Sequence, residues 1–297
     1  MSAVPAPGPS APPTGKRGGG GSVALSRGGR RALTVFFVAF LIFLYVPTVL
    51  LIIFSFNKST VAAFPLAGLT LDWYREAFTD PQIRTALMNS LKVASACAVL
   101  ATFFGVMVSF PLARRKVWFR SGVSALLLLP LVVPTVVLGV ALLILFQRGF
   151  LHVPLGLGAV LIGHVIIALP FCVLLIMPRI ASIDKRLEEA AYDLGASGLT
   201  TFRRVILPLI VPAILSAFLI AFVVSIDEVV VASFLTSDSV TYPIYLYSGL
   251  KFPEKTQTLI PIATVMILLS FALAFAAEAL RRVGERRVGL EAPPGGV

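Results

Sequence analysis

Residues 181–210 read ASIDKRLEEAAYDLGASGLTTFRRVILPLI, a polar and patterned segment that separates two long apolar runs. Four small or apolar residues in it recur at the spacing of one helix face: Leu187, Ala190, Ala191 and Leu194. This spacing predicts a short amphipathic helix. Asp184 can cap the start of that helix, and Gly195 can end it in the left-handed conformation.

A second helix is expected after the glycine, because Phe202, Val205 and Ile206 again share one face. Ser197 or Thr200 can cap it, and it leads into the next apolar run. A water-exposed helix with a narrow face of small residues suits a groove on a partner protein. The alternative is that the first helix lies on the lipid headgroups, and the pattern alone leaves both interpretations open.

The composition around this segment is typical of a membrane protein. Of the 297 residues, 58% are hydrophobic and 13% are charged, and the mean hydropathy is +0.95. Soluble domains are about 45–50% apolar and about 25% charged. Uniformly apolar runs of nearly the length that a spanning helix needs occur at 33–56, 91–112, 122–146, 157–177, 209–226 and 259–277. We therefore expect an all-α, polytopic membrane protein with six transmembrane helices, since the strands of a barrel would alternate in polarity.

The placement of Lys and Arg predicts the orientation of the chain. Of the 25 basic residues, 18 fall in the two termini and in the loops on the same side, including 178–208. The positive-inside rule then puts both termini and this loop in the cytoplasm. The net charge of +11 does not indicate nucleic-acid binding, because the basic residues are clustered between apolar runs and not on a soluble face.

The chain is expected to have three parts. Residues 1–31 are rich in Pro, Gly and Ser, which predicts a disordered cytoplasmic tail. Residues 32–282 form the transmembrane domain, which includes the polar loop 181–208. Residues 283–297 form a second cytoplasmic tail.

The polar segment also carries a motif with long, specific spacing. Its residues are Glu189, Ala190 and Ala191, then Gly195, and finally Leu207 and Pro208. With this motif the chain resembles the EAA-loop permeases of binding-protein-dependent ABC importers, a family with the MetI-like fold. Val205 stands where the family pattern has isoleucine. The resemblance implies that these residues form the coupling loop, which sits in a cleft of an ATPase subunit.

The resemblance also implies the partners and the location. The complex would lie in a bacterial inner membrane and would contain a second homologous permease, a dimer of ATPase subunits and an extracytoplasmic solute-binding protein. The ATPase would bind ATP, so no cofactor is expected on this chain, and the chain would not be an enzyme. Its only Gly-Lys pair, Gly15-Lys16, is followed by Arg17 and not by the Ser or Thr of a P-loop.

A second part of the sequence narrows the solute. The stretch Ser225-Ile226-Asp227-Glu228-Val229-Val230 is followed by Tyr242-Pro243-Ile244-Tyr245. Both are similar to stretches of spermidine/putrescine permease subunits, in particular the C-type partner of a B/C pair, so the second permease would be B-type. Related permeases for ferric iron, opines or amino-acid-like solutes share parts of these stretches and stay alternatives. A secondary transporter driven by an ion gradient is disfavoured, because no inverted repeat is visible.

Two adjacent acids, Asp227 and Glu228, interrupt the apolar stretch 209–235. Ionisable groups inside a membrane are unfavourable and usually face a cavity or a partner. A carboxylate pair could offset the dehydration of a polyamine through charge-assisted hydrogen bonds. We therefore assign Asp227, Glu228 and Tyr245 to the substrate pathway as a hypothesis. The alternative is that the fifth span ends at Ile226 and the pair lies in water.

Other reactive residue types have simpler expected roles. Cys97 and Cys172 lie in apolar runs without CxxC spacing, so we expect them to be buried like small apolar residues. His164 stands alone in the fourth run, where a packing histidine is favoured over a proton relay. The sequence predicts neither a metal site nor a catalytic set of Ser, His and Asp.

Overall fold

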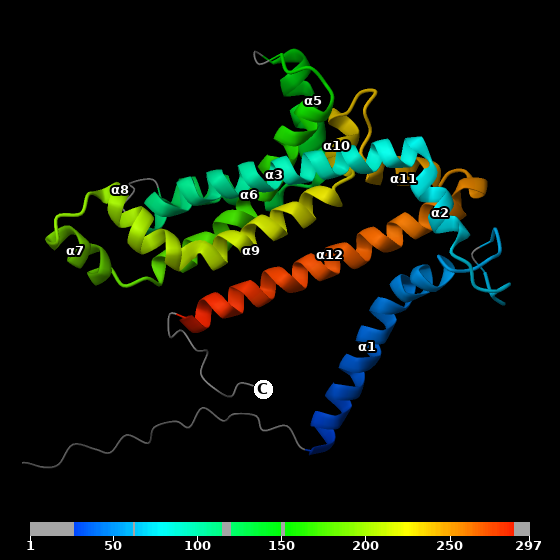
Figure 1. Ribbon diagram of the computed structural model, residues 1–297, viewed down its shortest axis with the longest axis horizontal. Coiled ribbons are helices and arrows are strands. Elements are labelled where there is room, and N and C mark those ends of the chain that lie inside the picture. The colour runs from blue at the N-terminus through cyan, green and yellow to red at the C-terminus, as the bar shows by residue number, and fades with distance from the viewer. Residues whose placement is uncertain (1–26, 62, 115–119, 150–151, 288–297) are drawn as a thin grey trace, which may run out of the picture. The chain divides into compact units, whose positions relative to one another are not determined.

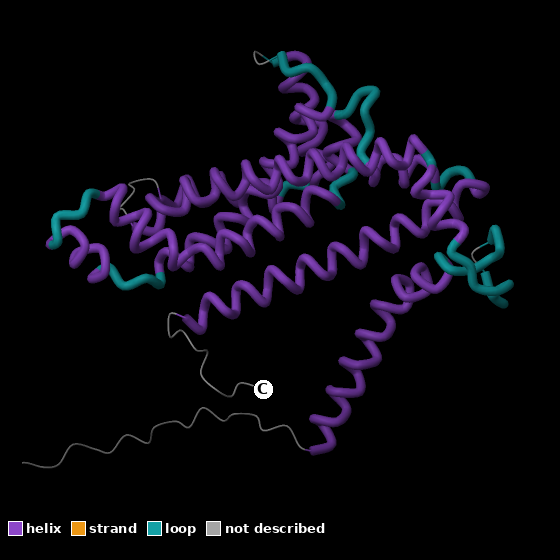
Figure 2. The backbone as a smooth tube through the Cα atoms, viewed as in Figure 1, coloured by secondary structure: helices purple, strands orange, loops and turns teal. Residues whose placement is uncertain are grey.

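The computed structural model describes residues 27–61, 63–114, 120–149 and 152–287. In this part of the chain every regular element is helical (Figures 1 and 2), and the one β-type contact is an isolated bridge between Asn57 and Leu69. The all-α prediction is therefore confirmed. Of the two predicted tails, 1–26 and 288–297 lie outside the described residues, whereas 27–31 and 283–287 are helical.

The described elements, in chain order, are α1 (Arg27–Phe54), α2 (Asp72–Thr79), α3 (Pro81–Arg114), α4 (Arg120–Val132), α5 (Thr135–Arg148), α6 (Leu157–Ala181), α7 (Arg186–Asp193), α8 (Gly198–Thr201), the π-helix η1 (Phe202–Ile206), α9 (Leu207–Ile226), α10 (Val230–Leu235), α11 (Tyr242–Gly249) and α12 (Pro253–Arg287). Contacts divide the chain into two units, residues 1–50 and residues 51–297. The first unit contains most of α1, whose large apolar side chains, such as Phe36 and Phe43, are exposed.

Five helical stretches in the described part are long and apolar enough to cross a membrane: Gly28–Phe54, Pro81–Arg114, Leu157–Ala181, Gly198–Ile226 and Lys255–Val283. The run expected at 122–146 is instead broken into α4 and α5, which meet at an angle of 108°. Pro134 explains the break, because proline disfavours helical backbone at the preceding residue, Val133. The described part of the chain contains six candidate spans when this bent pair is counted as one crossing.

The core of the second unit lies where α3, α6 and α9 pack against one another. Small buried residues line these contacts: Cys97, Ala98, Ala101, Ala168, Cys172, Ala217 and Ala221. Small side chains let helix backbones approach closely, and the resulting van der Waals packing is one of the contributions that hold helices together in lipid. Both cysteines are buried free thiols, as expected.

Among the side-chain hydrogen bonds that join α9 and its end to neighbouring helices, three involve serine hydroxyls. His164 Nδ1 on α6 lies 2.8 Å from Ser225 Oγ on α9. Ser216 Oγ donates to the carbonyl oxygen of Ala277 on α12 over 2.7 Å. Ser270 Oγ on α12 donates to Asp227 Oδ2, just after α9, over 3.0 Å. His164 is buried and bonded within the helix packing, in agreement with the expected packing role.

The close approach of α3 and α6 at Gly105 predicts which glycine tolerates a methyl group. A Cβ added at Gly105 would lie 2.7 Å from Cys172 Cβ, whereas one added at Gly158 meets nothing within 4 Å. Gly105→Ala should therefore lower the stability by about 1–3 kcal/mol through overpacking. Thermal unfolding of the purified protein in detergent measures this, with Gly158→Ala as the matched control. Equal melting temperatures for the two variants would contradict the packing described here.

Candidate functional site: the polar loop and an acidic pair after α9

The polar loop, residues 181–208, contains the predicted amphipathic helix as α7. At the start of α7, Asp184 Oδ1 accepts a hydrogen bond from the Arg186 amide over 3.0 Å. At its end Gly195 has φ +79°, and the amides of Gly195 and Ala196 donate to the carbonyls of Tyr192 and Ala191. These two bonds are the Schellman pattern, so the prediction that Gly195 ends the helix in the left-handed conformation is confirmed.

The second helix of the loop begins at Ser197 and not at Thr200, because Ser197 Oγ accepts from the Thr200 amide over 3.3 Å. It continues through η1 into α9 without a gap. The π turn was not predicted, although Pro208 signals it. Proline has no amide hydrogen and restricts the residue before it, and Leu207 instead donates to the carbonyl of Phe202 in an i→i+5 bond.

The apolar face of α7 is uncovered in this chain. None of the residues of α7 is buried, and Leu194, directly after it, is 89% exposed. Leu187, Tyr192 and Leu199 are exposed as well. Exposed apolar groups gathered on one short helix and its turn indicate a surface that a partner covers.

The six motif residues lie at two places in the loop. Glu189, Ala190 and Ala191 are on α7, and Gly195 follows its end. Leu207 and Pro208 form the first turn of α9, where Leu207 packs against the α3–α6–α9 core. The first group therefore faces outward from the loop, and the second joins the loop to the membrane domain.

Asp227 lies directly after the last residue of α9 and is exposed in this chain. Its partner Ser270 is about 16 Å from Arg281 and about 22 Å from Lys255 along α12, at 1.5 Å per residue. Asp227 is therefore level with the interior of a spanning helix, although α9 does end at Ile226 as the alternative expected. A carboxylate at this depth needs water or a polar partner beside it.

Glu228 has a structural role that the sequence reasoning missed. Its Oε1 accepts hydrogen bonds from the amides of Val230 and Val231 over 2.8 and 2.9 Å. These are the first two amides of α10, so the carboxylate caps this helix and its negative charge meets the positive end of the helix dipole. The sequence did contain a signal for this cap, because Glu228 lies two residues before the apolar stretch that forms α10.

Tyr245 is on α11 and hydrogen-bonds neither acid in the structure. Its hydroxyl donates to Gln82 Oε1 on the first turn of α3 over 3.2 Å. Burial, and then the negative charge of Asp80, raise the pKa of Tyr245, so the hydroxyl stays protonated and can donate. Tyr245 and Asp238 line a pocket of about 440 Å³.

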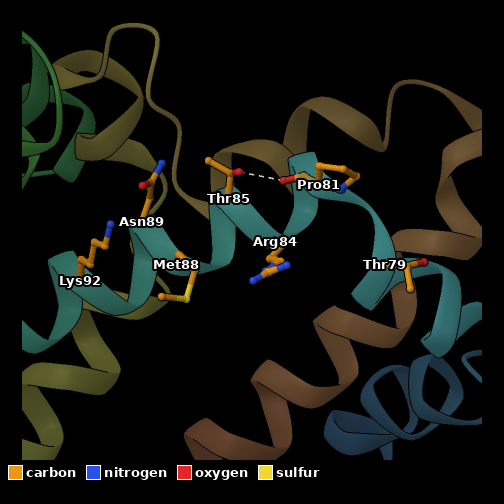
Figure 3. Close-up of a pocket in the computed structure, with 7 residues that line it drawn as sticks. All are labelled: Thr79, Pro81, Arg84, Thr85, Met88, Asn89 and Lys92. Atoms are coloured by element: carbon orange, nitrogen blue, oxygen red, sulfur yellow. Dashed lines mark hydrogen bonds between the residues drawn. The ribbon is translucent and has the colours of Figure 1, made fainter.

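A second pocket, of about 360 Å³, lies beside the first and is lined by the end of α2 and the start of α3 (Figure 3). Its lining residues are Thr79, Pro81, Arg84, Thr85, Met88, Asn89 and Lys92. Arg84 and Lys92 make it unfavourable for an ammonium group. The two pockets share Pro81, Thr85 and Asn89, so the start of α3 separates a cationic recess from one that contains a carboxylate.

Comparison with known proteins agrees with this geometry. Residues 101–289 match the family described as binding-protein-dependent transport system inner membrane component. The spermidine/putrescine transport system permease protein PotC of Haemophilus influenzae is 34% identical over 81% of this chain and 92% of its own length. The putrescine transport system permease protein PotI of Escherichia coli is 33% identical over 70% of this chain and 76% of its own.

Solved structures share the fold at lower identity. A chain of a bacterial alginate ABC transporter, in complex with its alginate-bound periplasmic protein, has a TM-score of 0.59 at 19% identity and covers 90% of this chain and 96% of its own. A chain of the MetNI methionine ABC transporter has a TM-score of 0.53 at 18% identity, over 69% of this chain and 99% of its own. The expected MetI-like permease fold is therefore confirmed.

The capping bonds of Glu228 predict a stability effect that depends on the acceptor oxygen and not on the charge alone. Glu228→Ala removes the acceptor and should cost about 1 kcal/mol, whereas Glu228→Gln keeps an acceptor and should cost clearly less. Thermal unfolding of both purified variants tests this. If Gln is as destabilising as Ala, the carboxylate does not act as a cap.

Proposed function

The chain belongs to the family of binding-protein-dependent transport system inner membrane components, and we propose that it is the permease subunit of an ABC importer for polyamines such as spermidine and putrescine. As a transport component it supplies the path of the solute, and a separate ATPase supplies the energy. The relatives named for spermidine and putrescine transport match most of this chain and nearly all of their own length, which is the observation that carries the solute assignment.

The position of Asp227 supports a cationic solute. An exposed carboxylate level with the middle of α12 is unfavourable against lipid and favourable beside a water-filled path. An ammonium group that passes it exchanges water for a charge-assisted hydrogen bond, and a polyamine can do so with each of its amines in turn. Glu228 contributes negative charge close by while one of its oxygens caps α10.

The uncovered surface of α7 supports the proposed ATPase partner. In this proposal Leu187, Tyr192 and Leu194 fill a groove on one subunit of an ATPase dimer, which binds the ATP. A second, homologous permease of B-type completes the path, and an extracytoplasmic binding protein delivers the solute. ATP closes the ATPase dimer, draws the α7 helices of both permeases together and shifts the pair toward an outward-open state.

The proposed orientation follows from the same loop. The basic residues of the termini and of the loop lie on one side, which the positive-inside rule places in the cytoplasm. The segments that hold Tyr245 and the two pockets are then extracytoplasmic, where the binding protein docks. The chain is therefore a multi-pass protein of the bacterial inner membrane in this proposal.

Asp227→Asn should lower polyamine uptake about tenfold or more, which corresponds to about 1.4 kcal/mol along the path. ATP hydrolysis should persist, because Asp227 is far from the cytoplasmic loop. The measurement is radiolabelled putrescine uptake beside ATPase activity in reconstituted vesicles. Asp72→Asn, an exposed acid on α2, is the matched control for loss of one charge. Undiminished uptake by Asp227→Asn would remove the acid from the pathway and make another solute of the family equally suitable.

Gly195→Val should weaken binding of the ATPase while membrane insertion stays normal. A β-branched residue at φ +79° is strained, so the end of α7 would unwind and its apolar face would lose its shape. Gly198→Val is the control, since Gly198 is helical and its added Cβ would meet no atom closer than 3.8 Å. Co-purification of the ATPase with each variant is measured. Full recovery with Gly195→Val argues against a docking role for this loop.

A further inference from the structure

The side chain of Arg114, the last residue of α3, ties the membrane domain to the cytoplasmic loop at two points. Its Nη1 and Nη2 both donate to the carbonyl oxygen of Ile183, before α7, over 3.1 Å. Its Nε lies 2.7 Å from Glu188 Oε1, in the first turn of α7. One planar guanidinium group therefore fixes both the approach to α7 and α7 itself.

This contact is shielded from water. The Arg114 side chain is 7% exposed and that of Glu188 is 14% exposed. A charge in such a setting is stable only while its partner is present, and removal of either one leaves the other dehydrated and unpaired. Lysine cannot replace the arginine, because a single ammonium group does not reproduce the two donors to Ile183 together with a positive charge beside Glu188.

The rest of α7 makes little buried contact with the chain. None of its residues is buried, and its apolar face is open for the proposed partner. A force applied to α7 by that partner therefore reaches α3 through a short, nearly dehydrated ion pair at Glu188 and through the two hydrogen bonds at Ile183. Exposed surface ion pairs, which are solvated and give way easily, would not transmit it in this way.

The helix that Arg114 ends is continuous as far as the outer side of the membrane domain. Between Arg114 and Asn89 it extends for about 37 Å at 1.5 Å per residue. There Asn89 Nδ2 donates to the carbonyl of Val240 over 3.0 Å, and Ser90 Oγ accepts from the Tyr242 amide over 2.8 Å. A shift of the inner end of α3 would thus be felt by the segment that precedes α11 and the pocket of Tyr245.

A second arginine holds the other side of the loop. Arg179, near the end of α6, donates from Nε and Nη2 to the carbonyl of Leu209 in α9 over 3.0 and 2.9 Å. This bond joins two spanning helices to each other and does not involve α7. Arg114 differs because its two contacts lie on the loop itself, before and within α7.

We propose that Arg114, through Glu188 and Ile183, is the positioning residue that transmits movement of α7 to α3, so that ATP hydrolysis by the partner is converted into opening of the pathway. This inference rests on the proposed function. If the inference is correct, loss of the Arg114 contact lowers transport while ATP hydrolysis continues, and the ATPase stays bound. A contact that only stabilises the fold would instead lower both activities together.

The test uses the complete transporter in vesicles with its binding protein, and measures putrescine transported per ATP hydrolysed. Glu188→Gln keeps the shape and removes the charge, Arg114→Gln removes the fork, and the double variant removes both. We expect each single variant to lower the ratio at least fivefold, with the ATPase still co-purified. The ratio of the double variant should stay within twofold of the lower of the two single-variant ratios, since both changes break the same contact. Arg282→Gln, an exposed arginine at the cytoplasmic end of α12, is the matched control and should keep the ratio.

An unchanged ratio in Glu188→Gln would overturn the proposal, and so would effects of the two single changes that multiply in the double variant. Loss of the ATPase from the Glu188→Gln complex would also overturn it, because the contact would then serve assembly. If the wild-type transporter hydrolyses ATP but moves no polyamine, the result contradicts the proposed function and leaves the role of Arg114 to be tested separately. In that case the dependence of ATPase activity on the binding protein replaces the ratio as the measure of coupling.

Discussion

Apolar side chains gain little when they leave lipid for protein, so α3, α6 and α9 must be held together by close packing and by polar contacts. Gly105 allows α3 to approach Cys172 on α6, and alanines line the contact of both with α9. The loop and the acidic pair lie at the two ends of these helices. The positions of the loop and of the acidic pair therefore depend on the packing of these three helices.

Buried polar groups set the position of α9 within that contact. His164 bonds Ser225, and Ser216 bonds a carbonyl of α12, so α9 is fixed to two neighbours at two depths. An unpaired polar group in this setting is costly, which disfavours sliding of one helix past another. Asp227 lies two residues after Ser225, the first of these fixed points. Its carboxylate is thus presented at a constant depth, with Ser270 as its partner.

The sequence predicted features that depend on local rules and missed those that depend on tertiary contacts. Asp184, Gly195 and the helical spacing between them predict α7 correctly, because capping and left-handed glycine are local. The break before Pro134 and the π turn before Pro208 had local signals in the prolines, but proline in a membrane helix is often tolerated without a break. No pattern in the sequence indicated the partner of Tyr245, whose hydroxyl donates to Gln82 in the fold, and its assignment to the substrate pathway stays a prediction. Such a partner, distant in the chain, cannot be read from spacing.

One continuous helical segment connects the two parts of the site. From Gly198 through the π turn to Ile226 the chain extends for about 42 Å at 1.5 Å per residue, with the loop surface before it and Asp227 directly after it. The other link is α3, which begins at the two pockets and ends at Arg114 against the same loop. The segment Gly198–Ile226 starts just after the turn that follows α7, and α3 ends at Arg114, which contacts α7. The segment and α3 also pack against each other along the core.

A displacement of the loop must therefore either move both helices together or slide one along the other at their small-residue contact. Close packing at Gly105 and the alanines resists shear, because any sliding brings side chains into the space that only small residues allow. Movement of the helices as one body is the remaining response, and such a movement would displace Asp227 and the two pockets together.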